Sequence, residues 1–275
     1  MRFQDKVVLV TGSTQGLGLG IARQFAGEGA RVVVNGRHGD EVAQAVAAIR
    51  DDGGQATGIP TDISDSAQVR RMFEEIQARF GTVDIIVNNA ALTPTDAASK
   101  RARIQAMAMM TTPIPKVSLN VTAEMSDETW QAMIATNLNG TFYCTREALK
   151  LMEPQHRGNI INIASIAGLS GLSSHSPHYS ASKGAIVAFT KSVALEVIGA
   201  GINVNCIAAG GIATEAWDHL IKAAGDAVKA QLLQVIPAGR MGTIAEFTSL
   251  ALYLASDEAA YLVGQVISPN GGLVT

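Results

Sequence analysis

The stretch "KVVLVTGSTQGLG" at residues 6–18 joins a short apolar run to a turn that contains Gly12, Gly16 and Gly18. The run is rich in β-branched residues, which is typical of a buried strand, and the segment at 17–28 has a helical pattern. Glycines at such a turn let the backbone bend sharply and approach a pyrophosphate at the N-terminus of the helix. Because the spacing is G-x-x-x-G-x-G rather than G-x-G-x-x-G, the stretch predicts a nucleotide site only if the rest of the chain agrees.

The alternation of strand and helix continues along the chain. Helices are predicted at 40–50 and 66–80, and seven short runs have the composition of buried strands. The predicted strands are at residues 6–10, 31–34, 56–61, 83–89, 159–165, 202–208 and 265–269. Near-continuous apolar strands separated by helices favour a parallel sheet covered on both faces. We therefore expect an α/β fold with a doubly wound, Rossmann-like parallel sheet of about seven strands.

Two long segments interrupt this alternation. They are an insertion at about 93–125 and a substrate-loop segment at about 214–242. Both follow predicted strands at the carboxyl edge of the sheet, where ligands bind in open α/β folds. The chain has no repeat, low-complexity tract or linker, so residues 1–275 are predicted to form a single dinucleotide-binding and catalytic domain.

The composition excludes several classes of function. A net charge of −3 offers no electrostatic reason to bind nucleic acid or an anionic membrane. No apolar run approaches the ~20 residues that span a bilayer, and the N-terminus lacks the apolar stretch of a secretory signal. Cys144 and Cys206 are far apart and have no Cys/His cluster around them, so no metal site is suggested. We expect a cytoplasmic protein that acts on a small molecule.

A second stretch, "SHSPHYSASKGA" at residues 174–185, places a tyrosine four residues ahead of a lysine. On a helix this spacing brings Tyr179 and Lys183 to one face. A free tyrosine titrates near ~10, and a desolvated ammonium close to it favours the phenolate. A packed tyrosine with a solvated lysine has the same spacing. The pair therefore indicates proton transfer only in combination with Ser165 and the nucleotide-type turn.

Five motifs occur in order along the chain. They are "TGSTQGLG" (11–18), "NNAA" (88–91), "IATNLNGTF" (134–142), "NIASIAG" (162–168) and "YSASK" (179–183). With this order and spacing the sequence resembles the short-chain dehydrogenase/reductase family almost from end to end. Within that family, "IPAGRMG" (236–242) and the segment at 254–267 are similar to the 3-oxoacyl-carrier-protein reductase-like carbonyl reductases. The insertion at 93–125 is longer than the family's usual segment, and Ala209 stands where the family has proline.

The resemblance implies four catalytic residues. Tyr179 would donate or accept the proton, and Lys183 would hold the nicotinamide ribose and lower the pKa of the tyrosine. Ser165 would orient the substrate carbonyl. Asn137 would hold a water that extends the proton relay, although a buried amide that satisfies a helix kink is compatible with its position. Hydride transfer itself is chemistry that the nicotinamide supplies.

The resemblance also implies a set of cofactor-binding residues at the turn and the strand ends. They are Gly12, Ser13, Thr14, Gln15, Gly16, Leu17, Gly18, Arg37, Asp62, Ile63, Asn89, Ala90, Tyr179, Lys183, Gly210, Ile212 and Thr214. Asn88 is a further expected contact to the cofactor backbone.

The end of the second strand favours NADP(H) over NAD(H). Asn35 and Gly36 are uncharged there, whereas an acidic residue would bind a free ribose 2′-hydroxyl. Arg37 follows, and a planar guanidinium suits a 2′-phosphate. Gln15 adds no second positive charge, so NAD(H) stays possible.

We therefore predict reversible, NADP(H)-dependent hydride transfer between nicotinamide and a ketone or secondary alcohol. Candidate substrate residues are Leu172, His175, His178 and Trp217. The alternatives are an NAD-dependent secondary-alcohol dehydrogenase acting on a sugar, polyol, steroid or aromatic alcohol, and a catalytically silent binding protein. A serine hydrolase is disfavoured because "NIASIAG" lacks the G-x-S-x-G elbow. From the family resemblance we expect a homotetramer or homodimer, and no bound metal.

Overall fold

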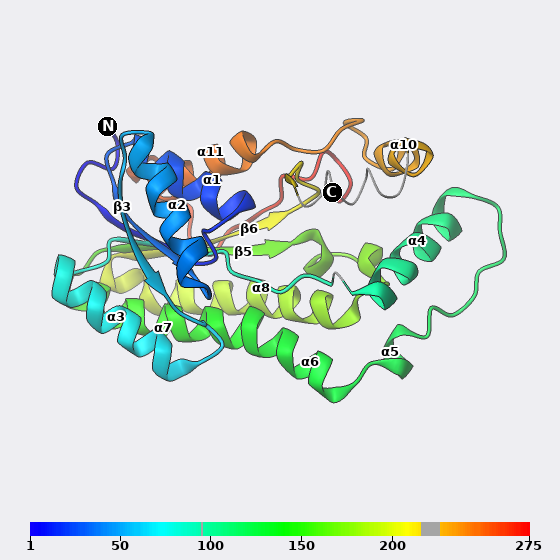
Figure 1. Ribbon diagram of the computed structural model, residues 1–275, viewed down its shortest axis with the longest axis horizontal. Helices are drawn as coiled ribbons and strands as arrows, with labels where there is room; N and C mark the ends of the chain where they lie inside the picture. The colour runs from blue at the N-terminus through cyan, green and yellow to red at the C-terminus, as the bar shows by residue number, and fades with distance from the viewer. Residues whose placement is uncertain (95, 216–225) are drawn as a thin grey trace.

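The computed structural model describes residues 1–94, 96–215 and 226–275 (Figure 1). Its strands form one parallel sheet in the order β3-β2-β1-β4-β5-β6-β7. Their bounds are β1 Val7–Val10, β2 Arg31–Gly36, β3 Gln55–Pro60, β4 Ile85–Asn88, β5 Gly158–Ser165, β6 Ile202–Ala209 and β7 Val266–Ile267. Each of the seven predicted strands is present, and the doubly wound parallel sheet is confirmed.

Helices cover both faces of the sheet, as Figure 1 shows. On one face lie α1 Gly16–Gly27, α2 Gly39–Asp51 and α11 Ile244–Leu254, and on the other α3 Ser66–Phe80, α7 Gly140–Met152 and α8 Pro177–Val197. The interior strand β1 contributes to both layers, because Val8 and Val10 pack into the first core and Val7 and Leu9 into the second. Successive side chains of a strand point to opposite faces, so a strand buried on both faces has to be apolar throughout.

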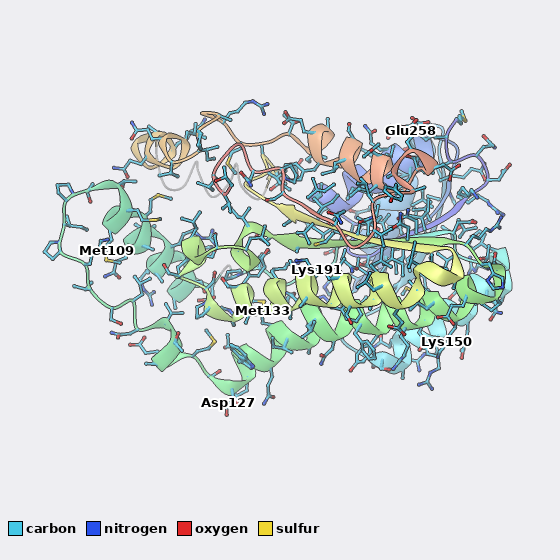
Figure 2. All side chains as sticks on the ribbon, turned by 180° about the vertical axis from the view of Figure 1, so that it is seen from behind. Met109, Asp127, Met133, Lys150, Lys191 and Glu258 are labelled. Atoms are coloured by element: carbon cyan, nitrogen blue, oxygen red, sulfur yellow. The ribbon has the colours of Figure 1, made fainter. Side chains whose placement is uncertain are left out.

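The two long segments contain helices of their own. The insertion at 93–125 forms α4 Ala97–Thr111 and α5 Val121–Glu124, and the second segment contributes α10 Asp226–Gln234. Figure 1 places α4 and α10 at the end of the molecule where the strands finish. In the reverse view of Figure 2, Met109 on α4 lies at the opposite end of the molecule from Lys150 and Glu258.

The remaining helical segments are short or join longer ones. Helix α6 Asp127–Ile134 continues through a π-helical turn, η1 Ala135–Asn139, into α7. Single 3₁₀ turns are found at Glu153–Gln155, Ile166–Gly168, Gly171–Ser173, Ile198–Ala200 and Asp257–Ala259. None of the helices in the described ranges is long and apolar enough to cross a membrane.

A chain of hydrogen bonds between buried amides and hydroxyls connects strands β4 and β5 to helices α7 and α8. Asn88 on β4 donates through Nδ2 to Thr145 Oγ1 on α7 (3.1 Å) and to Asn162 Oδ1 on β5 (2.8 Å). Asn162 Nδ2 in turn donates to Thr190 Oγ1 on α8 (2.9 Å), and the exposed fractions of these four side chains range from 0% to 4%. Buried hydrogen bonds of this kind favour one alignment of the helices on the strands, because a shift of a helix along the sheet would leave donors or acceptors without partners.

Removing the central amide of this chain should destabilise the fold. Asn162→Ala leaves both its donor, Asn88, and its acceptor, Thr190, without that bond in the interior, which corresponds to about 2–3 kcal/mol of unfolding free energy. Urea unfolding measures the loss, and the control is Gln44→Ala on the exposed face of α2. Equal stability of the two variants would show that the buried chain contributes no net stability.

Candidate active site

The turn after β1 needs glycine for two separate steric reasons. Gly12 and Gly16 have φ of +61° and +56°, a left-handed region that glycine adopts without strain. At Gly18 the reason is space, because an added Cβ would lie 2.2 Å from the carbonyl oxygen of Gly12 and 2.5 Å from Nδ2 of Asn89. The backbone thus approaches itself more closely at this turn than any larger residue permits.

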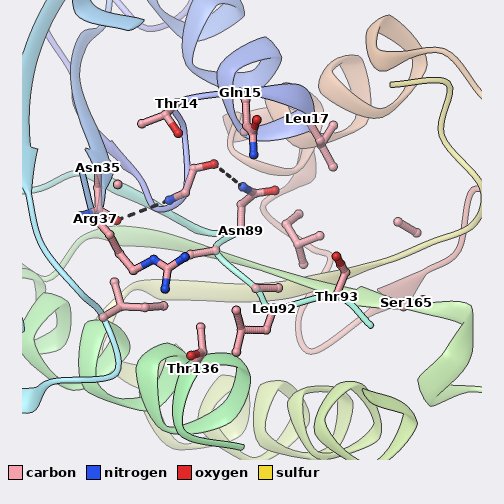
Figure 3. Close-up of a pocket in the computed structure, with 18 of the residues that line it drawn as sticks. Thr14, Gln15, Leu17, Asn35, Arg37, Asn89, Leu92, Thr93, Thr136 and Ser165 are labelled. Carbon is pink, nitrogen blue, oxygen red and sulfur yellow. Dashed lines mark hydrogen bonds between the residues drawn. The ribbon is translucent and has the colours of Figure 1, made fainter. Parts of the chain in front are cut away.

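Side chains from two other strand ends hold the turn in place. Asn89, just after β4, donates through Nδ2 to the carbonyl oxygens of Thr11 and Gly12, both at 3.0 Å. The amide of Gly12 donates to Asn35 Oδ1 on β2 at 3.4 Å, and Figure 3 shows bonds on both sides of the turn. Three neighbouring strands therefore meet at the turn, where the chain order of the sheet reverses and ligands of doubly wound folds bind.

A cleft of about 510 Å³ opens beside this turn (Figure 3). Its wall contains most of the predicted cofactor-binding residues and the predicted catalytic serine. They are Gly12, Thr14, Gln15, Leu17, Gly18, Arg37, Asp62, Ile63, Asn89, Ala90, Ser165, Tyr179, Lys183, Gly210 and Ile212. The structure thus brings together one continuous surface from segments that are far apart in the sequence.

Some predicted contacts lie elsewhere. Ser13 is fully buried, and its hydroxyl donates to the carbonyl oxygen of Val10 at 2.7 Å, so it shapes the turn rather than the wall. Gly16 and Thr214 are also outside the wall of the cleft, and Thr214 packs near Gly16. Asn88 is also outside the wall of the cleft, and its Nδ2 donates within the buried chain between β4, β5 and α7, so the expected contact to the cofactor backbone stays a prediction.

The cleft wall also includes residues that the sequence did not assign to cofactor binding. They are Asn35, Gly36, His38, Glu41, Thr61, Ala91, Leu92, Thr93, Thr136, Ile163, Ala164 and Ala209. Most of them sit at or just beyond the carboxyl end of a strand. Their position after a strand is the only feature of the sequence from which they could have been identified, because their side chains have no charge or functional group in common.

Helix α8 carries the tyrosine and the lysine on one face, as their spacing predicts. Lys183 is 2% exposed, and its Nζ donates to the carbonyl oxygen of Ile163 on β5 at 2.7 Å. Burial lowers the pKa of this ammonium to about 8. The same Nζ lies 5.8 Å from the centre of the Tyr179 ring. Ser165 is the last residue of β5, two residues beyond Ile163, and its hydroxyl lies close enough to the Tyr179 phenol to lower the pKa of that phenol.

The electrostatics of the phenol differ from the expectation. Burial raises the pKa of Tyr179, and the hydrogen bond from Ser165 and the charge of Arg103 on α4 lower it. The Lys183 ammonium, which was expected to lower that pKa, is held against the Ile163 carbonyl 5.8 Å from the ring centre, and its effect on the phenol stays a prediction. Arg103 of the insertion is thus a cation near the phenol in addition to Lys183 of α8.

Asn137 lies in the π-helical turn and has no exposed surface. Its Oδ1 accepts from the amide of Leu92 (2.7 Å), and its Nδ2 donates to the carbonyl oxygen of Leu92 (3.1 Å) and to Ser182 Oγ on α8 (3.0 Å). The side chain thus ties the segment after β4 to α8. The interpretation as a buried amide at a helix irregularity fits these contacts, and the water relay stays a prediction.

The three predicted substrate residues that the structure describes, Leu172, His175 and His178, do not line the cleft. His175 is half-buried and its Nε2 accepts a hydrogen bond from Arg103, while His178 is only 2% exposed. Leu172 is half-buried in a 3₁₀ turn, and Trp217 lies outside the described residues. No hydrogen bond joins either histidine to Ser165 in the described ranges, which removes the geometric basis for a serine hydrolase.

Comparison with known proteins gives matches along the whole chain. A family model described as short chain dehydrogenase matches residues 6–224. The chain is 34% identical over 273 residues to the 3-oxoacyl-acyl-carrier-protein reductase FabG of Escherichia coli (strain K12), with 99% of each protein covered. It is also 34% identical over 269 residues to the FabG reductase of Staphylococcus aureus (strain Mu50), with 98% of each covered. Among solved structures, a variant of actinorhodin polyketide ketoreductase with NADPH matches with a TM-score of 0.84 and 31% identity, over 98% of this chain and 97% of that one.

The close approach at the turn predicts the effect of a single methyl group. Gly18→Ala forces the new Cβ against the Gly12 carbonyl, so we expect affinity for a dinucleotide to fall at least about 10-fold. Titration of the folded variant with NADPH, followed by fluorescence, measures the change. Gly27→Ala in the last turn of the same helix is the control, because nothing lies within 4 Å of its added Cβ. Equal affinities of the two variants would contradict the role assigned to the turn.

Proposed function

Because this chain belongs to the short-chain dehydrogenase family, and is thus an oxidoreductase acting on carbonyl or hydroxyl groups, we propose that it reduces a ketone with NADPH, reversibly, and that Tyr179 exchanges the proton. The observation that carries this proposal is the meeting of Tyr179, Ser165 and Lys183 at one end of a cleft whose other end is the glycine turn. The 3-oxoacyl-acyl-carrier-protein reductases and the polyketide ketoreductase similar to this chain have the same class of activity by name.

The residues of the cleft fit a dinucleotide. Glycine at positions 12 and 18 lets the turn close against Ala90 and Asn89, where an added Cβ would clash, and this closed turn leads into the N-terminus of α1, a favourable place for a pyrophosphate. Lys183 has one of its three N–H donors on the Ile163 carbonyl, and the others are free to bind ribose hydroxyls in the cleft. When bound, the nicotinamide supplies the hydride.

NADP(H) is the favoured cofactor. Arg37 is exposed at the end of β2, forms no ion pair with a carboxylate in the described ranges, and extends its guanidinium into the cleft in Figure 3. A planar guanidinium at this position suits a 2′-phosphate. The similar polyketide ketoreductase was solved with NADPH.

The chain's own residues provide the proton path. The Ser165 hydroxyl and the Tyr179 phenol both line the cleft, so a substrate carbonyl there can accept hydrogen bonds from both. The bond from Ser165 stabilises the phenolate that forms when Tyr179 gives up its proton, and the charge of Arg103 acts in the same direction. Burial opposes both effects, so the phenol remains protonated at neutral pH and is ready to act as a general acid.

One observation favours NAD-dependent oxidation of a secondary alcohol as the second candidate. Glu41 at the start of α2 also lines the cleft beside Arg37. An acidic side chain there can accept hydrogen bonds from a free ribose 2′-hydroxyl and repels a 2′-phosphate. The oligomeric state stays a prediction, as does the natural substrate within the class of ketones and secondary alcohols.

Loss of the phenolic hydroxyl should remove the proton exchange. We expect Tyr179→Phe to lower kcat by about 10²–10⁴-fold with little change in NADPH affinity, since the ring and its packing remain. Absorbance of the reduced nicotinamide, followed with a panel of ketones and alcohols, gives the rates. Tyr253→Phe on α11 is the matched control. Turnover in Tyr179→Phe equal to that of the control would refute the mechanism.

The two cofactor hypotheses differ in the response to a neutral residue at position 37. Arg37→Gln should weaken NADPH binding about 10-fold and leave NADH binding within about 2-fold, because only the 2′-phosphate loses a charge-assisted partner. Dissociation constants for both nucleotides decide the matter. If wild type binds NADH more tightly than NADPH, the NAD-dependent alternative is correct.

A further inference from the structure

Arg103 is a half-buried cation without an acidic partner in the described ranges. Its Nε donates to His175 Nε2 at 3.2 Å and its Nη2 to the carbonyl oxygen of Pro94 at 3.1 Å. Both acceptors are neutral, and burial lowers the pKa of the guanidinium. A guanidinium has five N–H donors, so most of its hydrogen-bonding capacity remains available. A charge that has lost part of its hydration and gained no counter-ion is costly to a fold unless it serves a ligand.

The position of Arg103 links it to the reacting end of the cleft. It belongs to α4, and the segment before that helix, including Leu92 and Thr93, forms part of the cleft wall. Arg103 also hydrogen-bonds at 3.2 Å to His175, which is only four residues before Tyr179, and its charge acts on the phenol. If the carbonyl of a substrate lies at Ser165 and Tyr179, the Arg103 guanidinium therefore lies near the part of the substrate beyond that carbonyl.

The hydrogen bond between the two side chains determines their charges. Because Arg103 Nε can only donate, His175 Nε2 must accept, so the ring proton of a neutral imidazole is on Nδ1. Burial and the charge of Arg103 lower the pKa of His175 to about 4, which keeps the imidazole neutral at physiological pH. The pair thus carries one positive charge, and His175 restrains the direction in which the guanidinium points.

We propose that Arg103 binds a carboxylate of the substrate, with His175 as the positioning residue, so that the enzyme acts on an oxo acid or the corresponding hydroxy acid. This inference rests on the proposed ketone reduction and names the substrate class for it. The insertion, rather than the sheet and its helices, then selects the substrate.

The charge and shape of the site favour a carboxylate over other groups. A guanidinium presents two parallel N–H donors that match the two oxygens of a carboxylate, and such a bidentate pair is stronger than neutral hydrogen bonds. The single positive charge of the Arg103–His175 pair balances a monoanion, whereas a phosphate monoester carries close to two negative charges. An ester, amide or thioester carries none and leaves the guanidinium uncompensated.

The test compares acids with their neutral esters. The substrates are 2-, 3- and 4-oxopentanoate and their methyl esters, each reduced with NADPH by wild type, Arg103→Gln, Arg103→Lys and Arg101→Gln. Arg101 is exposed on the same helix and serves as the matched control. The quantity measured is the ratio of kcat/KM for acid to kcat/KM for ester, in which any effect of Arg103 on the Tyr179 phenol cancels.

We expect wild type and Arg101→Gln to favour at least one acid over its ester. Arg103→Gln should lower that ratio about 10- to 100-fold, as expected for loss of a charge-assisted bond, and Arg103→Lys should lower it less. The carbonyl position with the highest ratio reports how far the guanidinium lies from Ser165 and Tyr179. Equal ratios in wild type and Arg103→Gln would overturn the inference while leaving the proposed ketone reduction intact.

A binding measurement makes the result independent of turnover. Calorimetric titration of wild type in the presence of NADPH with pentanoate, pentanamide and pentyl phosphate should give measurable binding for the carboxylate and at least about 10-fold weaker binding for the amide and the phosphate. Equal or tighter binding of the amide or the phosphate would overturn the carboxylate site, even if Arg103→Gln failed to fold. If wild type bound pentanoate but reduced none of the ketones with either nucleotide, the failure would lie in the proposed function.

Discussion

A buried ammonium group needs a hydrogen-bond partner, and Lys183 finds one in the backbone carbonyl of Ile163. This bond joins α8 to β5 near the carboxyl end of the strand, so it fixes the position of the helix along the strand direction. Tyr179 is one helical turn before Lys183, and Ser165 is two residues after Ile163. The contact between phenol and serine hydroxyl is therefore a consequence of where the ammonium is bound.

The same region is reinforced by polar groups that never face the cleft. Asn88, Asn162 and Thr190 connect β4, β5 and α8 in the interior, and Asn137 connects the segment after β4 to the start of α8. Each of these bonds is protected from water, so each resists displacement of the helix that carries Tyr179. The site is thus preorganised by buried side chains outside the wall of the cleft.

The fold was largely predictable because its signals are local. Apolar β-branched runs and helical periodicity marked all seven strands and the first helices, and the glycines of the turn have the positive φ or the close backbone contact that they implied. The sequence did not indicate that two adjacent residues of one motif have different surroundings. Asn88 and Asn89 are neighbours in "NNAA", yet Asn88 is buried in the polar chain and Asn89 holds the turn beside the cleft.

By itself, the sequence determined the order of the strands and helices, the glycine turn and the spacing of Tyr179 and Lys183, because each of these depends on a few consecutive residues. Only the tertiary structure revealed that a charge from the insertion also lies near the phenol. Arg103 is separated from Tyr179 by the whole of α6, α7 and β5 along the chain, and no local pattern in the insertion marks it. Electrostatic interactions depend on distance in space and on burial, and both arise only when the insertion folds over the carboxyl edge of the sheet.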